Sequence, residues 1–76
     1  MAIELIPGSS YQLTNETKIG RCEFRKDEIV VFTSGGYSPY DDCYIYHFVS
    51  GAGEKRACAC QVPLTEGELE VFELVL

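Results

Sequence analysis

The hydrophobic positions of this chain fall into short runs separated by glycine and proline. The breaks recur at intervals of about 8 to 12 residues, and the runs between them are rich in β-branched and aromatic side chains, as in small all-β domains. The pattern predicts five strands, over residues 10–14, 28–34, 43–50, 54–62 and 69–76.

The connections between these runs have signatures of their own. Residues 48–55 predict a tight hairpin, because their two glycines supply the positive φ angles that a turn between strands requires. Residues 15–27 are polar except for Ile19, Cys22 and Phe24, so they predict a structured loop with these three side chains tucked beneath it. Residues 37–42 predict a surface turn.

The C-terminal segment allows two structures. Thr65 and Glu68 have the spacing of a capping box ahead of Leu69, which is compatible with a helix from Glu66 onward. Gly67 in the first turn and the β-branched and aromatic residues that follow oppose a long helix. We therefore expect one helical turn near residues 64–67 and then the last strand.

The order strand, long polar loop, strand, strand, tight hairpin, strand, helical turn and strand resembles a Src-homology-3-like (SH3-like) barrel. Residues 23–31 are similar to the loop-to-strand passage of that family, and Val62-Pro63-Leu64 is similar to its strand-to-helical-turn junction. The resemblance implies one domain, residues 1–76, folded as a five-stranded antiparallel SH3-like barrel with one short helical turn before the last strand. It does not imply binding of proline-rich peptides, because the chain has no Trp for the family's groove and no Tyr follows Pro63.

The length and net charge of the chain limit the classes of function that it can have. A chain of 76 residues buries only about 60% of its unfolded surface, so disulfides, a metal or self-association would supplement its core. Six Lys and Arg against twelve Asp and Glu give a net charge of −6, which disfavours direct nucleic-acid binding. The short apolar runs predict no membrane span, and the absence of a secretory signal leads us to expect a cytoplasmic protein.

The four cysteines leave three readings open. Cys58 and Cys60 share one face of a strand, so they could form half of a zinc site completed by Cys22, Cys43 or His47. Disulfides are the second reading, and small apolar residues in a reduced core are the third. The spacing lacks paired zinc knuckles, so we favour the third reading and expect no metal or other cofactor.

Catalysis has little support in the sequence. His47 is the only histidine, and its neighbours two positions away are Ile45 and Val49, which predicts a packed side chain in a strand. Cys43 would share its face, but four strand residues separate their Cα atoms by about 13 Å. We therefore expect a protein without enzymatic activity.

Tyrosines mark a candidate recognition surface. Tyr37, Tyr40, Tyr44 and Tyr46 fall within ten residues, and tyrosine combines rigid apolar area with a polar tip that suits partner surfaces. We expect Glu23 and Asp27 from the long loop to join them and to select a basic protein partner.

Apolar residues occupy both faces of several predicted strands. A solitary antiparallel sheet has one solvated face, so either another copy or another protein covers the outer faces, or strongly coiled strands bury both sides locally. We favour the first and predict a homo-oligomer, a dimer or higher. The candidate interface residues lie in the last strand: Val71, Phe72, Leu74 and Val75.

These observations predict a small non-enzymatic binding or adaptor module that self-associates through apolar strand faces. An acidic inhibitor or nucleic-acid mimic, encoded by a mobile element, is the alternative, because a negative surface can occupy a nucleic-acid-binding protein. Small acidic chains of this kind also resemble the products of phage or integron gene cassettes.

Overall fold

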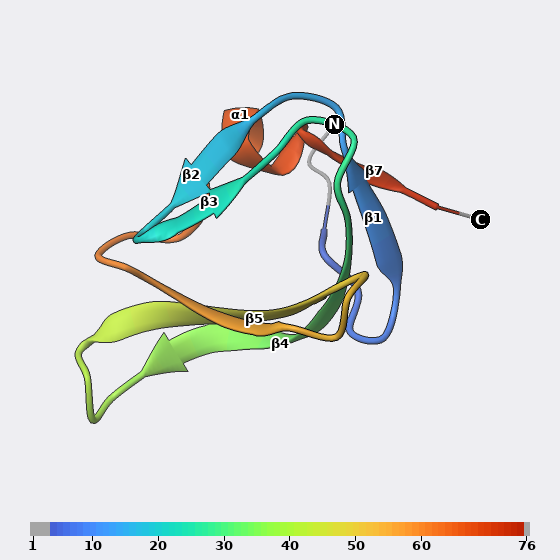
Figure 1. Ribbon diagram of the computed structural model, residues 1–76. Helices are drawn as coiled ribbons and strands as arrows, with labels where there is room; N and C mark the ends of the chain where they lie inside the picture. The colour runs from blue at the N-terminus through green and yellow to red at the C-terminus, as the bar shows by residue number, and fades with distance from the viewer. Residues whose placement is uncertain (1–3, 76) are drawn as a thin grey trace.

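The computed structural model describes residues 4–75, in which two antiparallel sheets and one short helix enclose a single core (Figure 1). The larger sheet has the strand order β6-β5-β4-β1-β7, and β2 pairs only with β3. The elements are β1 (Ser10–Leu13), β2 (Thr17–Ile19), β3 (Cys22–Phe24), β4 (Ile29–Ser38), β5 (Cys43–Ser50), β6 (Lys55–Cys60), α1 (Glu66–Leu69) and β7 (Phe72–Leu74).

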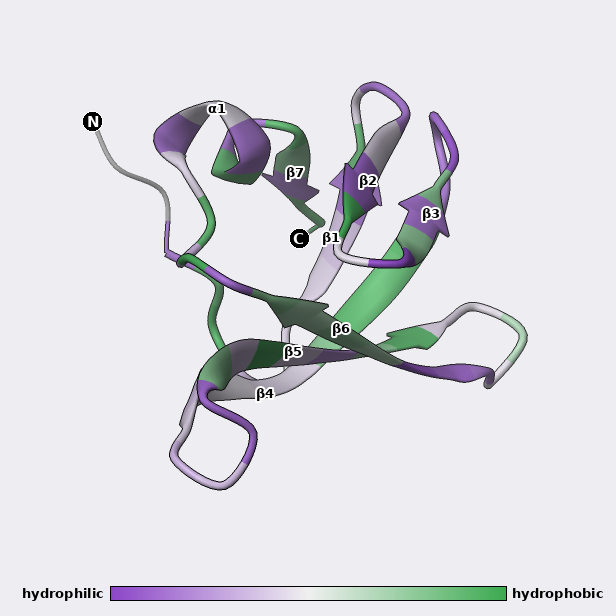
Figure 2. Ribbon diagram, turned by 90° about the vertical axis from the view of Figure 1, so that its left-hand side faces the viewer, coloured by the Kyte–Doolittle hydropathy of each residue, from purple (hydrophilic) through white to green (hydrophobic). Residues whose placement is uncertain are grey.

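The all-β prediction is confirmed, and so are the five predicted strands, which are β1, β4, β5, β6 and β7. The closed barrel is wrong, because within residues 4–75 the five-stranded sheet stays open between its edge strands β6 and β7. The β2–β3 hairpin contacts β6 instead, so the edge that would meet β7 in a barrel is covered by another element. In Figures 1 and 2, this hairpin and α1 face β4 and β5 across the core.

The long polar connection forms the β2–β3 hairpin and is not the loop that its composition predicts. Ile19 and Phe24 are buried and Cys22 is half-buried, as expected for side chains tucked beneath this segment. Gly20 makes the turn with a φ of 60° and lies against the backbone of Ala59 in β6. Three apolar side chains were therefore enough to seat a hairpin on the edge of the sheet.

Strand β4 runs four residues beyond its predicted end. Its distal half pairs with β5 through Gly35, Gly36 and Tyr37, after a β-bulge between Phe32 and Ser34. We expected the strand to end at residue 34, before these two glycines. They instead lie within a ladder, because β5 supplies a partner strand. The bulge bends β4, so the strand contributes both to the core and to the tyrosine-rich end of the sheet.

Aromatic rings fill the centre of the core. Phe48 and Phe72 stack with their centroids 5.4 Å apart, and Phe24 meets both edge-on. Tyr11 packs edge-on against Phe72 from β1. Four elements of both sheets therefore meet at one cluster, and the hydrophobic stretches of β4 and β5 in Figure 2 line it.

The C-terminal segment follows the helical-turn prediction, shifted by two residues. Thr65 caps α1, its hydroxyl accepts the Glu68 N–H, and the Glu68 carboxylate accepts the Thr65 N–H. The helix ends at Leu69 and β7 begins at Phe72, so the long helix does not form. Leu76, the predicted end of the last strand, lies outside the described residues. No helix within residues 4–75 has the length and apolarity needed to cross a bilayer.

Candidate binding site

A groove of about 490 Å³ lies between the tyrosine-rich end of the sheet, the N-terminal segment and α1. Its size is within the range of ligand-binding clefts. Tyr44 and Tyr46, two residues apart in β5, project from the same face of the strand, and Leu64 and Leu69 line the wall beside α1. The remaining lining residues are Glu4, Leu5, Pro7, Phe32, Gly35 and Gly36.

Gly35 is required for the shape of this groove. A Cβ atom at Gly35 would lie 2.8 Å from the Tyr46 ring and 2.9 Å from the Phe32 ring. The two rings therefore rest directly on the β4 backbone. The Tyr46 hydroxyl accepts a hydrogen bond of 3.2 Å from the Leu64 N–H, which fixes the ring against the segment leading to α1.

Tyr44 is held from the other side by Tyr37. The two residues are direct cross-strand partners, and their rings meet edge-on with centroids 5.4 Å apart. The Tyr37 hydroxyl donates a hydrogen bond of 2.6 Å to Asp42, which raises the pKa of this tyrosine above its ordinary value. An ordered series of Asp42, Tyr37 and Tyr44 thus leads into the groove.

Tyr11 positions the N-terminal wall. Its buried hydroxyl accepts the Ile6 N–H at 2.7 Å and donates to the Glu4 carbonyl at 3.4 Å. These bonds hold Leu5 and Pro7 beside the tyrosines of β5, so the groove is preformed on both sides.

Tyr40 stands apart from the groove. It lies at the tip of the β4–β5 connection with 98% of its surface exposed. A hydrogen bond of 2.9 Å from Ser38 to Asp41 braces the same connection. The four tyrosines are close together in the sequence, but of these four only Tyr44 and Tyr46 line the groove.

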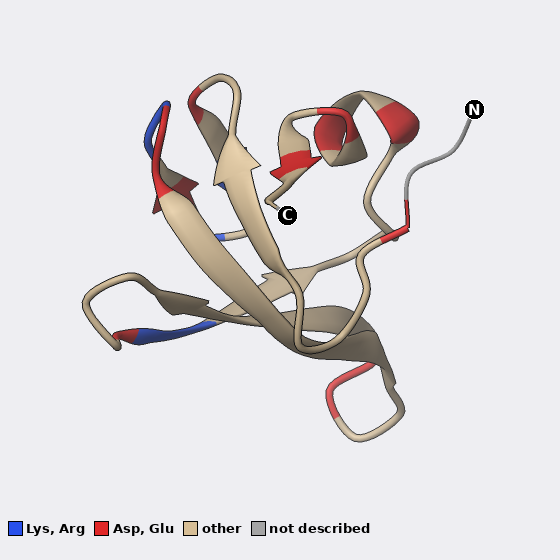
Figure 3. Cartoon of the chain, turned by 90° about the vertical axis from the view of Figure 1, so that its right-hand side faces the viewer, with Lys and Arg blue, Asp and Glu red and all other residues tan. Residues whose placement is uncertain are grey.

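The basic residues are segregated from this groove, whose lining contains no Lys or Arg. Every Lys and Arg of the chain falls within residues 18–26 or 55–56, in and around the β2–β3 hairpin and at the start of β6. The N-terminal segment, the β4–β5 connection, α1 and β7 carry acids and no basic residue (Figure 3). These acids are Glu4, Asp41, Asp42, Glu66, Glu68, Glu70 and Glu73.

Glu23 and Asp27 do not join the tyrosines. Glu23 lines a separate polar pocket of about 760 Å³ beside the β2–β3 hairpin, and Asp27 is exposed in the turn before β4 with a φ of 69°. The acids associated with the tyrosines are instead Glu4 and Asp42. Sequence separation concealed Glu4, which reaches the groove only through the tertiary contact with Tyr11, whereas Asp42 lies among the tyrosines in the sequence and could have been grouped with them.

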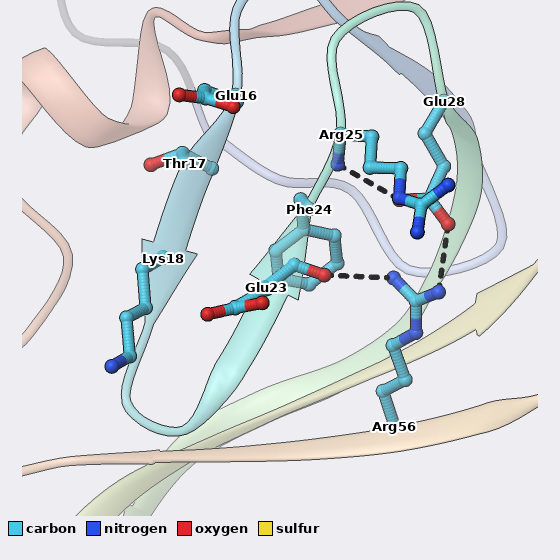
Figure 4. Close-up of a pocket in the computed structure, with 8 residues that line it drawn as sticks. All are labelled: Glu16, Thr17, Lys18, Glu23, Phe24, Arg25, Glu28 and Arg56. Carbon is cyan, nitrogen blue, oxygen red and sulfur yellow. Dashed lines mark hydrogen bonds and ion pairs between the residues drawn. The ribbon is translucent and has the colours of Figure 1, made fainter.

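The polar pocket is organised by Arg56 (Figure 4). Its guanidinium donates to Glu28 at 2.8 Å and to the Glu23 carbonyl at 3.4 Å, and it lies over the Phe24 ring. Burial alone would raise the pKa of Glu28, but hydrogen bonds from Arg56 and the Arg25 N–H, with both guanidinium charges, hold it below its ordinary value. The pocket's charges neutralise one another, so it offers no net attraction to an ion.

The cysteines and histidine form no metal centre. All four cysteines are free, and residues 4–75 contain no group of three or more metal-ligating side chains in a suitable position. His47 is exposed, so the prediction of a packed histidine is wrong. Its face of β5 is the outer one, since Phe48 beside it points into the core.

The four residues of the last strand that we expected to form an interface between copies divide between the core and the surface. Phe72 is 1% exposed at the centre of the aromatic cluster, and Val71 packs against the core. Phe72 is therefore not available on an outer face. Leu74 and Val75 are 44% and 41% exposed at the free edge of the sheet. Phe72 and Leu74 share one face of β7, so their different burial comes from position along the strand: Phe72 lies over the aromatic cluster, and Leu74 is at the exposed end.

No protein-family model, curated protein or solved structure matches this chain.

Proposed function

We propose that this protein is a small non-enzymatic binding module whose tyrosine-lined groove takes a segment of a protein partner. The carrying observation is the preformed cleft in which Tyr44 and Tyr46 lie side by side between the N-terminal segment and α1. Aromatic side chains held in a fixed position supply contact area at low entropic cost, which is typical of binding hot spots.

Charge complementarity defines the partner as a segment that combines apolar side chains with Lys or Arg. Glu4 lines the groove, and Asp42 is joined to it through Tyr37 and Tyr44. The surrounding N-terminal segment, β4–β5 connection and α1 carry no basic residue. Opposite charges would steer such a segment toward the apolar contacts and disfavour acidic competitors.

We also propose that the protein has an SH3-like architecture and works in the cytoplasm. The sheet order β6-β5-β4-β1-β7, with the β2–β3 hairpin inserted between β1 and β4, supports an SH3-like arrangement in an open form. Four free cysteines support a reducing compartment, because unpaired thiols are typical of intracellular proteins.

Replacing Tyr44 by alanine tests the groove. We expect a random-peptide phage library, selected on the wild-type protein, to yield peptides that combine Lys or Arg with aromatic or aliphatic residues. Synthetic versions should bind Tyr44→Ala at least about tenfold more weakly than the wild type, because a central aromatic contact is lost. Fluorescence polarisation of the labelled peptides measures this change.

Two further variants keep this result interpretable. Tyr44→Phe preserves the ring and should retain most of the affinity, and Val62→Ala changes an exposed side chain outside the groove and should bind normally. Circular dichroism checks that each variant is folded. Unchanged affinity in a folded Tyr44→Ala protein would rule out the groove as the binding site.

We also propose that the protein self-associates through the free edge at β7. Leu74 and Val75 expose apolar side chains on a strand that pairs with β1 on one side only. Unpaired strand edges with apolar side chains pair readily with a second copy.

Val75→Lys tests this second interface. We expect light scattering to give twice the chain mass of 8.5 kDa for the wild type and the single-chain mass for the variant. A charge on the edge disfavours strand pairing between copies. Val62→Lys is the matched control and should keep the wild-type mass. A wild-type protein that remains a single copy at high concentration would contradict the proposal.

One observation favours the alternative of an acidic inhibitor or nucleic-acid mimic, encoded by a mobile element. The N-terminal segment, the β4–β5 connection and residues 66–73 carry seven acids and no Lys or Arg. In that case, binding to a basic protein would depend on Glu66 and Glu70. The Glu66→Gln/Glu70→Gln protein would then lose affinity, and Tyr44→Ala would not.

A further inference from the structure

Cysteine side chains lie where the β2–β3 hairpin contacts the edge strand β6. The half-buried Cys22 thiol of β3 donates a hydrogen bond of 3.5 Å to the Ala57 carbonyl of β6. Cys58, the next residue, is fully buried in the core. Cys60 points to the same side of β6 as Cys58, because the two residues are two positions apart in the strand.

The Cys22 thiol meets the backbone of β6 beside Cys58, since Ala57, whose carbonyl it contacts, directly precedes Cys58. Burial first, and then interaction with the Cys22 thiol, raises the pKa of Cys58 far above its ordinary value. The backbones also approach closely, because a Cβ atom at Gly20 would lie 2.2 Å from the Ala59 carbonyl oxygen. The two thiols are therefore held near each other by packed backbone on both sides.

We propose that Cys22 and Cys58 form a reversible dithiol–disulfide pair that takes a small disulfide, such as oxidised glutathione, as its oxidant. Cys22 is the attacking thiol, because its side chain reaches solvent and Cys58 does not. A disulfide within the chain would join β3 directly to β6.

The reaction has two balanced exchange steps. Cys22 loses its proton and attacks one sulfur of the oxidant, whose S–S bond breaks and releases one small thiol that takes up a proton. Cys58 then loses its proton and attacks the Cys22 sulfur, and the mixed disulfide releases the second small thiol. This second step is the slower one, because burial raises the pKa of Cys58 and lowers its thiolate fraction. The two cysteines are oxidised by two electrons, and the oxidant is reduced to two thiols.

The disulfide would also fix the polar pocket. Arg56 in β6 reaches across to the Glu23 carbonyl and the Phe24 ring in β3, so the same two strands form the junction and the pocket wall. Oxidation is therefore expected to slow amide hydrogen exchange in residues 17–24 and to leave exchange in α1 unchanged.

Incubation of the native protein with oxidised glutathione tests the pair. We expect the intact mass to fall by two hydrogen atoms, peptide mapping to link Cys22 with Cys58, and dithiothreitol to restore the original mass. Cys22→Ser should abolish the link and is expected to fold, since its side chain is only half-buried. Cys60→Ser is the matched control in the same strand and should form the link as fast as the wild type.

Three outcomes would overturn the proposal. They are a link between Cys22 and Cys60, a product that stops at glutathione mixed disulfides, and formation of the internal disulfide only after addition of denaturant. Hydrogen exchange of the reduced Cys22→Ser protein shows whether its hairpin is still seated on β6, so an absent link cannot be attributed to unfolding.

Discussion

Replacing Phe48 by alanine is expected to lower the free energy of unfolding by about 3–5 kcal/mol. The ring is 1% exposed and contacts Phe24, Phe32 and Phe72, so its removal leaves a cavity that four elements would have to collapse to fill. Small domains are stable by only about 5–15 kcal/mol, and this one is at the lower end by size. Urea unfolding followed by circular dichroism measures the change.

Tyr40→Ala is the control for Phe48→Ala. It also removes an aromatic ring, but this ring is 98% exposed, so the unfolding free energy should change by no more than about 0.5 kcal/mol. Similar losses for the two variants would mean that the aromatic cluster is not the centre of the core.

Gly20→Ala should have the second largest effect, a loss of about 2–4 kcal/mol in unfolding free energy. Two costs add at this turn. The φ of 60° is unfavourable for alanine, and the new methyl group would lie 2.2 Å from the Ala59 carbonyl oxygen, which is backbone and cannot rotate away. The hairpin would have to move off β6, and amide exchange in residues 17–24 should accelerate.

Gly53→Ala separates these two costs. Gly53 has a φ of 86°, but no atom lies within 4 Å of its added Cβ. This variant should therefore lose only about 1 kcal/mol, the cost of the backbone conformation. Equal losses at Gly20 and Gly53 would show that the close approach of the hairpin to β6 contributes nothing.

The groove and the thiol junction share the neighbouring strands β5 and β6. The groove lies at the acidic end, between β5, the N-terminal segment and α1, and the thiol junction lies where the β2–β3 hairpin meets β6. Tyr46 of the groove is the cross-strand partner of Cys58, and Phe48 of the aromatic cluster lies two residues beyond Tyr46 in β5, in contact with Phe24 of the hairpin. Loss of Phe48 should therefore disturb both sites, whereas Tyr44→Ala and Cys22→Ser should each affect one.

Local patterns were reliable where a few neighbouring residues determine the outcome. The glycines of the β5–β6 turn and the capping box of Thr65 and Glu68 act over a few residues, and both predictions are confirmed. The pattern failed at residues 35–38, because Gly35 and Gly36 favour a turn only in the absence of a partner strand. Here, β5 pairs with them and extends β4.

The candidate site was predicted only in part for the same reason. Two tyrosines at positions i and i+2 of a strand must share a face, so Tyr44 and Tyr46 could be grouped from the sequence. Glu23 and Asp27 were assigned to them by charge alone, and the fold places these acids away from the groove. Glu4, Leu5 and Leu69 line it because the N-terminal segment and α1, which are distant in sequence from β5, pack beside its tyrosines.

The sequence by itself determined the strand-rich class, the β5–β6 hairpin, the helical turn and the excess of acid, because these depend on composition and on residues close along the chain. Tertiary structure alone decided that the sheet stays open, that Phe72 is buried while Leu74 and Val75 are exposed, and that the Cys22 thiol contacts β6 beside Cys58. Each of these depends on which distant strand packs against a given face, and the alternation of apolar residues in one strand does not specify its neighbour.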